Sequence, residues 1–235
     1  MSSLAAARPA RARLGRWPYD EGVAHLVLLD HQMVPTTSDV GDWIADATEL
    51  GARLVRTGAL FPNATGAFLE SGFQVADSLA LLTRSATPRT NPPARGAVRL
   101  RRLRPTMLSE AAAIDRRSFA SPWANDASAL GDIMTATPYH RSRSIDVDGR
   151  MVAFSISGRA DRSGYIQRLA VDPSARRHGF AHLLIDDAVR WMSRRGVSDV
   201  MVNTAANNHA ALALYDSVGF ERQPGTLLIL ERALR

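Results

Sequence analysis

The sequence predicts an α/β (α+β) protein whose mixed sheet is flanked by helices. Short apolar runs of strand length alternate with stretches in which apolar residues recur at helical spacing, a pattern typical of a sheet covered by helices. Between two strand-like runs, Asp148-Gly149 is a strong signal for a tight hairpin turn. Hydrophobic residues make up 46% of the 235-residue chain, which is enough to bury a substantial core.

The second half of the chain shows the clearest succession of elements. The apolar run 165–171 ends at Asp172-Pro173, because proline lacks the N–H that a strand needs. Asn208 is a good helix N-cap, and Gly219 fits the end of the helix that begins there. In chain order we expect a strand at 98–104, helices at 105–119 and 122–136, hairpin strands at 143–148 and 151–157, a strand at 165–171, a helix at 181–195, a strand at 200–204, a helix after Asn208 and a strand at 226–230.

The first half of the chain reads as an incomplete copy of the second. When the chain is shifted by 147 residues, six of the nineteen positions 55–73 are identical to their counterparts, where chance would give about one or two. A strand over 25–29 and a helix over 42–50 precede this repeat. Together they predict a truncated strand–helix–strand–helix–strand domain over residues 20–84. The alternative is a chance similarity between two α/β segments.

Composition excludes several classes of function. The chain has no cysteine, which rules out disulfides, thiolate metal sites and an acyl-cysteine intermediate, and we expect no metal. No apolar run approaches the length of a membrane span, and the arginine-containing start has no apolar signal segment. We therefore expect a cytoplasmic protein that makes no membrane contact.

Charge alone does not identify a partner. All 29 basic residues are arginine, and the net charge of +6 is compatible with nucleic acid or an acidic surface. Seven arginines fall between Arg84 and Arg104, but this stretch lacks the interleaved aromatics of a single-strand binding surface, so we do not expect nucleic acid. We interpret residues 85–97 as a proline- and arginine-rich linker, residues 1–19 as a disordered arm and residues 98–235 as the functional domain.

The segment before the helix at 181–195 is suited to a pyrophosphate. It reads RRHGFA over residues 176–181. A helix start offers unpaired N–H groups and a partial positive charge. Gly179 allows the backbone to approach a ligand closely, and Arg176 and Arg177 supply charge-assisted contacts. The alternative is an ordinary surface loop with solvated arginines.

The helix after Asn208 carries a candidate proton donor, Tyr215. A lone tyrosine on a partly apolar helix is more often a packed core residue than a catalyst. Its combination with the RRHGFA turn and the segments around both is what favours the functional interpretation.

Taken together, these segments resemble the GCN5-related N-acetyltransferase (GNAT) family, over roughly residues 98–235. The family motif R/Q-x-x-G-x-G/A appears as Arg176, Gly179 and Ala181. The resemblance implies the family's mostly antiparallel sheet. Similarity to its ribosomal-protein alanine N-acetyltransferase branch rests on Phe119–Trp123 (FASPW), Asn208-x-x-Ala211, Leu214-Tyr215 and Gly219-Phe220.

The resemblance also implies acetyl-CoA as cosubstrate and transfer of its acetyl group to an amine. Backbone groups near Leu169 and Val171 would bind the pantetheine like an added strand and polarise the thioester carbonyl. Tyr215 would protonate the departing thiolate. The residues that the resemblance assigns to acetyl-CoA binding are Leu169, Ala170, Val171, Arg176, Arg177, His178, Gly179, Phe180, Ala181, Asn208 and Ala211.

The general base is where the sequence departs from the family. Asn203 occupies the place where the alanine-acetyltransferase branch carries a glutamate, and an amide cannot take a proton at neutral pH. The strand at 165–171 offers only Gln167 and Arg168, and His140 and His209 are expected to be surface histidines. Keeping a lysine amine neutral at pH 7 costs about 4.6 kcal/mol, whereas an α-amine costs about 1.1 kcal/mol. We therefore expect an acceptor of low pKa, deprotonated through a water relay at Asn203.

Three functions follow as hypotheses. The first is a protein N-terminal acetyltransferase, and the second is the same chemistry on a small amine. The third is a non-catalytic acetyl-CoA-binding or sensing module, favoured by Asn203 and by the incomplete first half. That half carries Phe68 where the second carries Tyr215 and has no counterpart of the RRHGFA turn, so we expect a single active site.

Overall fold

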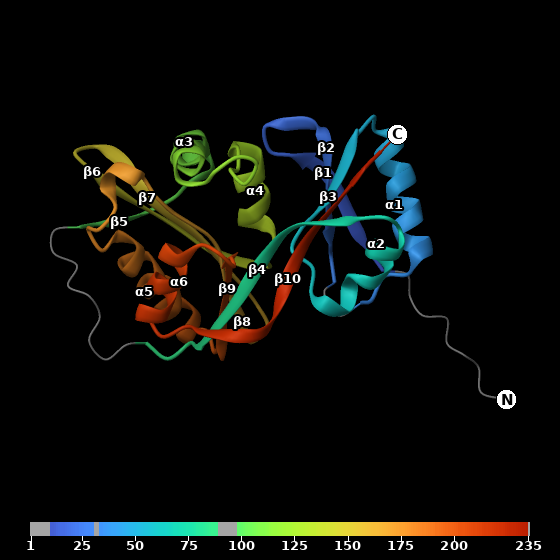
Figure 1. The fold of residues 1–235 in the computed structure, drawn as a ribbon. Coiled ribbons are helices and arrows are strands. Elements are labelled where there is room, and N and C mark those ends of the chain that lie inside the picture. Colours follow the sequence, from blue (N-terminus) through green and yellow to red (C-terminus); the bar gives the residue numbers. More distant parts are fainter. Residues whose placement is uncertain (1–9, 31–32, 89–97, 235) are drawn as a thin grey trace. The chain divides into compact units, whose positions relative to one another are not determined.

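The chain folds into two compact units (Figure 1). The computed structural model describes residues 10–30, 33–88 and 98–234. Of the expected arm and linker, residues 1–9 and 89–97 lie outside this range. The first unit is formed by residues up to Leu81 with Thr204–Asn207 and Pro224–Arg235, and the second by Leu82–Asn203 and Asn208–Gln223.

The second unit contains the mixed, mostly antiparallel sheet that the sequence predicts. Its strands lie in the order β9-β8-β7-β6-β5, with β8 and β9 parallel and the other neighbours antiparallel. Asp148 and Gly149 join β6 to β7 with φ angles of 50° and 76°, the left-handed pair that a tight hairpin turn requires. The strand bounds are Leu100–Arg102 (β5), Tyr139–Val147 (β6), Arg150–Ala160 (β7), Ser163–Val171 (β8) and Asp199–Ala205 (β9).

Helices cover both faces of this sheet (Figure 1). Alternate residues of a strand point to opposite faces, so Phe154 of β7 packs with α3 and α4 while its neighbour Ala153 packs with α5. The helices are α3 (Leu108–Ser118), α4 (Ala127–Thr135), α5 (Phe180–Ser193) and α6 (His209–Ser217). Within the described ranges no helix is long and apolar enough to cross a membrane.

The first unit has strand order β1-β2-β3-β10-β4 around its own core. Leu26, Val40, Val55, Phe68 and Leu230 are each fully buried in that core. Strands β2 and β3 are parallel, and β10 runs antiparallel to β3. The elements are β1 (Ala12–Trp17), β2 (Asp20–Leu28), α1 (Thr37–Glu49), β3 (Leu54–Thr57), α2 (Gly66–Glu70), β4 (Gln74–Ser85) and β10 (Glu221–Ala233).

The structure corrects two of the predicted boundaries between domains. Residues 12–17, expected in a disordered arm, form β1, which pairs antiparallel with β2, and Leu14 packs on the core of the first unit. The final strand, expected in the domain 98–235, pairs with β3 through Glu231↔Arg56 and belongs mostly to the first unit. Side-chain periodicity predicts a strand but does not specify its partner, so the sequence could not divide the chain at these points.

The helix expected from residue 122 begins only at Ala127. Asp126 adopts an extended conformation and its side chain accepts a hydrogen bond from the backbone N–H of Ala129 at 2.8 Å. This is the N-cap contact that starts α4. Residues 119–126 therefore form an irregular connection, called here the α3–α4 loop.

The sequence repeat has a counterpart in local geometry. After the shift of 147 residues, the helical segment 62–70 of the first unit corresponds to α6. Gly72 and Gly219 end the two segments with the same φ of 82°. Phe68 and Phe73 form an edge-to-face pair at 5.2 Å, and Tyr215 and Phe220 form one at 5.5 Å. The two segments thus fold alike, although only one carries a phenol.

Candidate active site

Strands β8 and β9 separate partway along their length. They pair at Ser163↔Asp199, Gly164↔Val200 and Tyr165↔Met201, and residues 166–171 have no such partner on β9. This part of the chain is fully described, so the edge of β8 facing β9 is open over Leu169–Val171. An open strand edge presents N–H and C=O groups that an extended ligand can pair with.

A β-bulge lies beside this opening. Ile156 pairs with Arg168 and Ser157 with Ile166, so Gln167 is the extra residue on β8. Bulges bend a strand and redirect its side chains. The Gln167 Oε1 atom is buried without a hydrogen-bond partner among the described residues, close to Gly158, where an added Cβ would lie 2.7 Å from it.

The RRHGFA turn has backbone features that favour binding of an anion. Arg177 and Gly179 have φ angles of 69° and 77°, and Gly179 is the N-cap of α5 without any side-chain cap. The first-turn N–H groups of α5 therefore remain available, and no acidic residue lies in that turn. His178 Nδ1 donates to the carbonyl of Arg176 at 2.8 Å, and its ring stacks on Phe180. Arg176 and Arg177 themselves are exposed.

At the start of α6, two predicted ligand-binding residues contact each other. The Asn208 side chain accepts a hydrogen bond from the Ala211 N–H at 3.2 Å, which caps the helix. Asn208 thus has a structural role as the helix cap, and this contact leaves its side-chain NH₂ group able to donate a further hydrogen bond. Asn203 lies exposed on β9.

Tyr215 lies buried on α6, with its ring packed edge-on against Phe220. Burial raises the pKa of Tyr215 to about 12, and the positive charge of Arg168 opposes this rise. The phenol is therefore protonated at neutral pH, as a general acid must be. Proton transfer to a thiolate of ordinary pKa, near 8.5, would cost about 5 kcal/mol. A thiolate leaving into the same buried surroundings is also desolvated, which raises its pKa toward that of the tyrosine.

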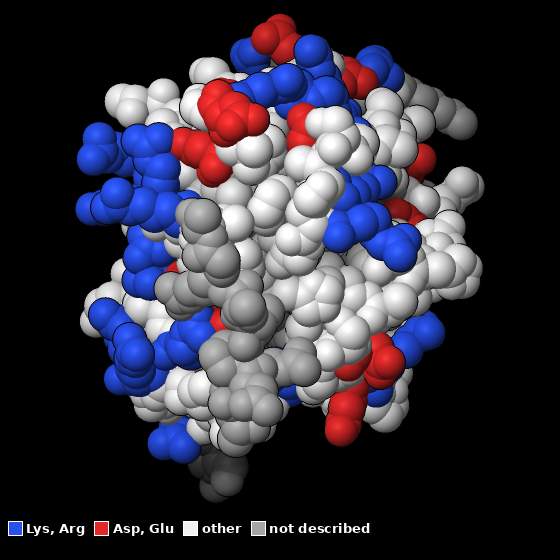
Figure 2. Space-filling view, turned by 90° about the vertical axis from the view of Figure 1, so that its left-hand side faces the viewer, with Lys and Arg blue, Asp and Glu red and all other residues white. Residues whose placement is uncertain are grey.

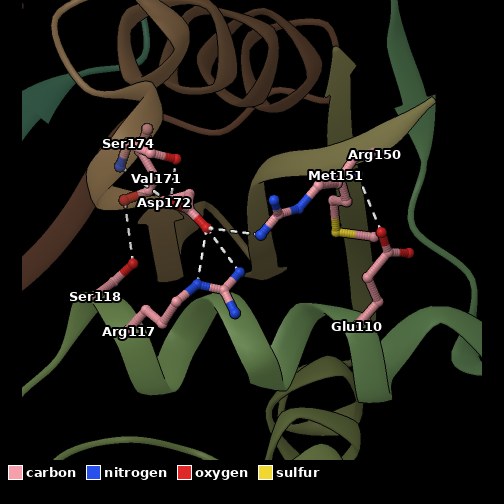
Figure 3. Close-up of polar contacts among 8 residues, drawn as sticks. All are labelled: Glu110, Arg117, Ser118, Arg150, Met151, Val171, Asp172 and Ser174. Atoms are coloured by element: carbon pink, nitrogen blue, oxygen red, sulfur yellow. Dashed lines mark hydrogen bonds and ion pairs between the residues drawn. The ribbon is translucent and has the colours of Figure 1, made fainter. Parts of the chain in front are cut away.

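Asp172, which directly follows β8, is linked to α3 by hydrogen bonds from Arg117 (Figure 3). Its carboxylate accepts hydrogen bonds from the N–H and hydroxyl of Ser174 and from Arg117 Nε and Nη2 at 2.9 and 2.6 Å. The Ser118 hydroxyl donates to the carbonyl of Val171 at 3.1 Å. Hydrogen bonds from Ser174, with the charge and hydrogen bond of Arg117, lower the pKa of Asp172 to about 2, although burial opposes them.

We expect Asp172→Asn to lower the free energy of unfolding at pH 7 by about 1–2 kcal/mol, after allowance for the partly exposed Arg117. A carboxylate whose pKa is depressed on folding stabilises the protein above its unfolded pKa of 3.8. The difference between wild type and variant should therefore persist above pH 4 and shrink as the pH falls toward 2. Urea unfolding across this range measures it, and a constant difference would contradict the assignment.

The other residues considered as bases from the sequence are Arg168, His209 and His140. Arg168 is paired with the carboxylate of Asp115, which is fully buried. His209 is exposed at the start of α6. His140 is exposed on β6 and lines a cavity of about 250 Å³ with Arg102, Arg141 and Trp191, among other residues, none of them a predicted site residue. Among the described residues no group of three or more His, Cys, Asp or Glu side chains could hold a metal ion.

The basic residues do not form one continuous surface on the face shown in Figure 2. Arginine side chains lie there in several separate groups, and acidic side chains lie beside those at the top. Part of the positive charge is compensated directly: Arg141 donates two hydrogen bonds to Asp187 at 2.6 and 2.9 Å, and Arg101 pairs with Asp146 at 2.5 Å. This mixed surface does not change the expectation that nucleic acid is not the partner.

Comparison with known proteins agrees with the geometry. Residues 109–220 match the model of the Acetyltransferase (GNAT) family. The ribosomal protein bS18 alanine N-acetyltransferase of Escherichia coli (strain K12) is 31% identical over 118 residues, which are 50% of this chain and 77% of that protein.

Solved structures extend the likeness of fold to nearly the whole chain. A GCN5-related N-acetyltransferase from Sphaerobacter thermophilus has a TM-score of 0.64 at 16% identity and covers 96% of this chain and 77% of its own. A tandem GNAT protein from the clavulanic acid biosynthesis pathway has a TM-score of 0.65 at 15% identity, covering 96% and 79%. At such identities these structures show the fold alone. Sequence and fold together place this chain in the Acetyltransferase (GNAT) family of acyltransferases, whose members use acetyl-CoA.

Proposed function

We propose that this acetyltransferase modifies a protein N-terminal α-amine or another amine of low pKa. The observation that carries the proposal is that, among the described residues, we find no free carboxylate beside the open edge of β8. Asn203 stands on β9, and the nearby carboxylates of Asp115 and Asp172 each accept hydrogen bonds from an arginine. Without a strong base in the site, the acceptor amine must already be neutral when it attacks. Deprotonation at pH 7 costs about 1.1 kcal/mol for an α-amine and about 4.6 kcal/mol for a lysine side chain.

In the proposed mechanism each segment has one task. The RRHGFA turn and the first turn of α5 bind the pyrophosphate, and Leu169–Val171 pair with the pantetheine. The amine attacks the thioester carbonyl, whose oxygen accepts a hydrogen bond from a β8 backbone N–H, and the C–S bond then breaks. Tyr215 gives its proton to the sulfur, and the proton lost by the amine reaches solvent through water at Asn203. The Tyr215 phenolate is reprotonated from solvent.

Two observations favour a peptide acceptor over a small amine. The E. coli relative is named for an alanine N-acetyltransferase activity on a ribosomal protein, and this chain shares the Phe119–Trp123 segment expected of that branch. A small-molecule amine acetyltransferase remains the second candidate. A non-catalytic acetyl-CoA-binding module is the third, favoured by Asn203 and by Phe68 in the first unit, which we propose to be a degenerate half of the same fold.

Initial rates on matched peptides test the acceptor. We expect a peptide with a free N-terminal alanine to be acetylated at pH 7, with a rate that levels off above pH 8 as its α-amine becomes neutral. The same peptide with a blocked N-terminus and one lysine should react poorly at pH 7 and rise about tenfold per pH unit up to pH 10. Mass spectrometry identifies the modified nitrogen.

Other results of this experiment would contradict the proposed acceptor or select another of the candidate functions. Efficient acetylation of the lysine peptide at pH 7 would mean that a base exists and would contradict the argument from Asn203. Turnover of small amines with none of peptides would select the second candidate. Binding of acetyl-CoA without turnover of any amine would leave only the non-catalytic module.

A further inference from the structure

An ion pair of unusual burial joins β8 to α3. Arg168 Nε donates to Asp115 Oδ2 at 2.7 Å, and Arg168 Nη2 donates to Oδ1 at 2.6 Å. The Asp115 side chain is fully buried, and that of Arg168 is 16% exposed. Such two-point pairing fixes the orientation of both side chains as well as their distance.

The same two residues hold the α3–α4 loop. The backbone N–H of Asn125 donates to Asp115 Oδ1 at 2.6 Å, and Arg168 Nη2 donates to the carbonyl of Trp123 at 2.9 Å. The guanidinium of Arg168 also lies 3.5 Å from the ring centroid of Phe119, within range of a strong cation–π contact. Three residues of this irregular loop, Phe119, Trp123 and Asn125, thus contact one ion pair.

This ion pair lies next to the reacting groups. Arg168 immediately precedes Leu169 on β8, and Ser118, at the end of α3, donates to the carbonyl of Val171. The charge of Arg168 also acts on the pKa of Tyr215, which it lowers against the effect of burial. The loop is therefore held beside the part of β8 at which acetyl transfer would occur.

We propose that Arg168 and Asp115 are positioning residues that set the α3–α4 loop as one wall of the acceptor site. The inference rests on the proposed acetyl transfer. Neither residue reacts: the carboxylate has no solvent access and the guanidinium remains charged. The pair acts through the loop, which must lie at a fixed distance from the thioester for the amine to attack.

The chemistry of arginine explains why lysine would not serve equally. Arginine bridges both oxygens of Asp115, donates to Trp123 and stacks on Phe119 at once, because its donors lie in one planar fork. Lysine keeps the charge but is a point donor. Arg168→Lys should therefore still neutralise Asp115 while it releases part of the loop, and Arg168→Gln should leave a buried carboxylate unpaired.

Steady-state kinetics with the best acceptor from the peptide panel test the proposal. We expect Arg168→Gln to raise the KM for the acceptor about 10–10²-fold and to lower kcat, while the KM for acetyl-CoA stays unchanged. Arg168→Lys should shift the same parameters less. The matched control is Arg117→Gln, which breaks a second ion pair from α3, to Asp172 at the end of β8; the hydrogen bonds of Arg117 Nε and Nη2 both go to Asp172 Oδ2. It should lower stability and leave the acceptor KM unchanged.

Hydrogen exchange gives a readout that needs no turnover. The amide of Asn125, bonded to Asp115 in the wild type, should lose protection in Arg168→Gln, together with its neighbours in the loop, while Arg117→Gln keeps it. Unchanged hydrogen exchange in the loop of Arg168→Gln would overturn the inference. So would a rise in the KM for the acceptor and in the KM for acetyl-CoA that is equally large in Arg168→Gln and Arg117→Gln. A wild type that transfers acetyl to no amine would refute the proposed function instead, and the exchange result would then decide whether the pair holds the loop.

Discussion

Tyr215→Phe is expected to lower kcat by about 10²–10⁴-fold while acetyl-CoA binds as tightly as before. The change removes one oxygen and keeps the ring that packs on Phe220 at 5.5 Å, so the helix and its core contact persist. What disappears is the proton for the leaving sulfur. Stopped-flow or steady-state assays with a good acceptor measure kcat, and calorimetry measures the affinity for CoA.

The control for this variant is Tyr139→Phe. Tyr139 lies on β6 of the same unit and is 56% exposed, so the same chemical change there should leave kcat as it is. Tyr215→Phe also tests whether one active site accounts for all activity, because the corresponding residue of the first unit, Phe68, has no hydroxyl. Full turnover in Tyr215→Phe would remove the proton-donor role, and the raised pKa of Tyr215 would then reflect nothing more than burial.

The sequence predicted the elements around this site well, for identifiable reasons. A tight hairpin turn needs left-handed backbone at two successive positions, which Asp148 and Gly149 tolerate better than most residues. Asn208 caps the helix that carries Tyr215. Helical spacing placed α5 close to its observed bounds. These signals are local, since each depends on residues within one turn or one strand.

What the sequence did not reveal depends on residues far apart in the chain. Arg168 and Asp115 are 53 positions apart, and the residues around each of them give no sign that the two form an ion pair. From the sequence, Arg168 is considered only as a residue at a possible position of the general base, a role for which arginine is unsuited. The bulge at Gln167 follows from the register between β7 and β8, which periodicity does not specify. For the same reason the sequence does not reveal that most of β10 belongs to the first unit and not to the domain expected over 98–235.

Removal of both arginines of the RRHGFA turn is expected to act on cofactor binding and not on chemistry. In Arg176→Ala with Arg177→Ala, we expect the KM for acetyl-CoA to rise about 10²-fold, because each charge-assisted contact to phosphate contributes about 1.5–3 kcal/mol. The value of kcat at saturating acetyl-CoA should stay near that of the wild type. Both side chains are exposed, so the fold should not depend on them.

A truncated substrate separates this explanation from a general loss of charge. Acetyl-pantetheine lacks the pyrophosphate, so the double variant and the wild type should use it equally well. Arg194→Ala with Arg195→Ala removes two charges from the other end of α5 and should leave the KM for acetyl-CoA unchanged. If that control raised the KM as much, the contribution of Arg176 and Arg177 would be long-range attraction, which salt should abolish. If the double variant also lost activity on acetyl-pantetheine, the turn would be shaping the thioester site itself, and the separation between a phosphate-binding turn and a reacting strand would have to be abandoned.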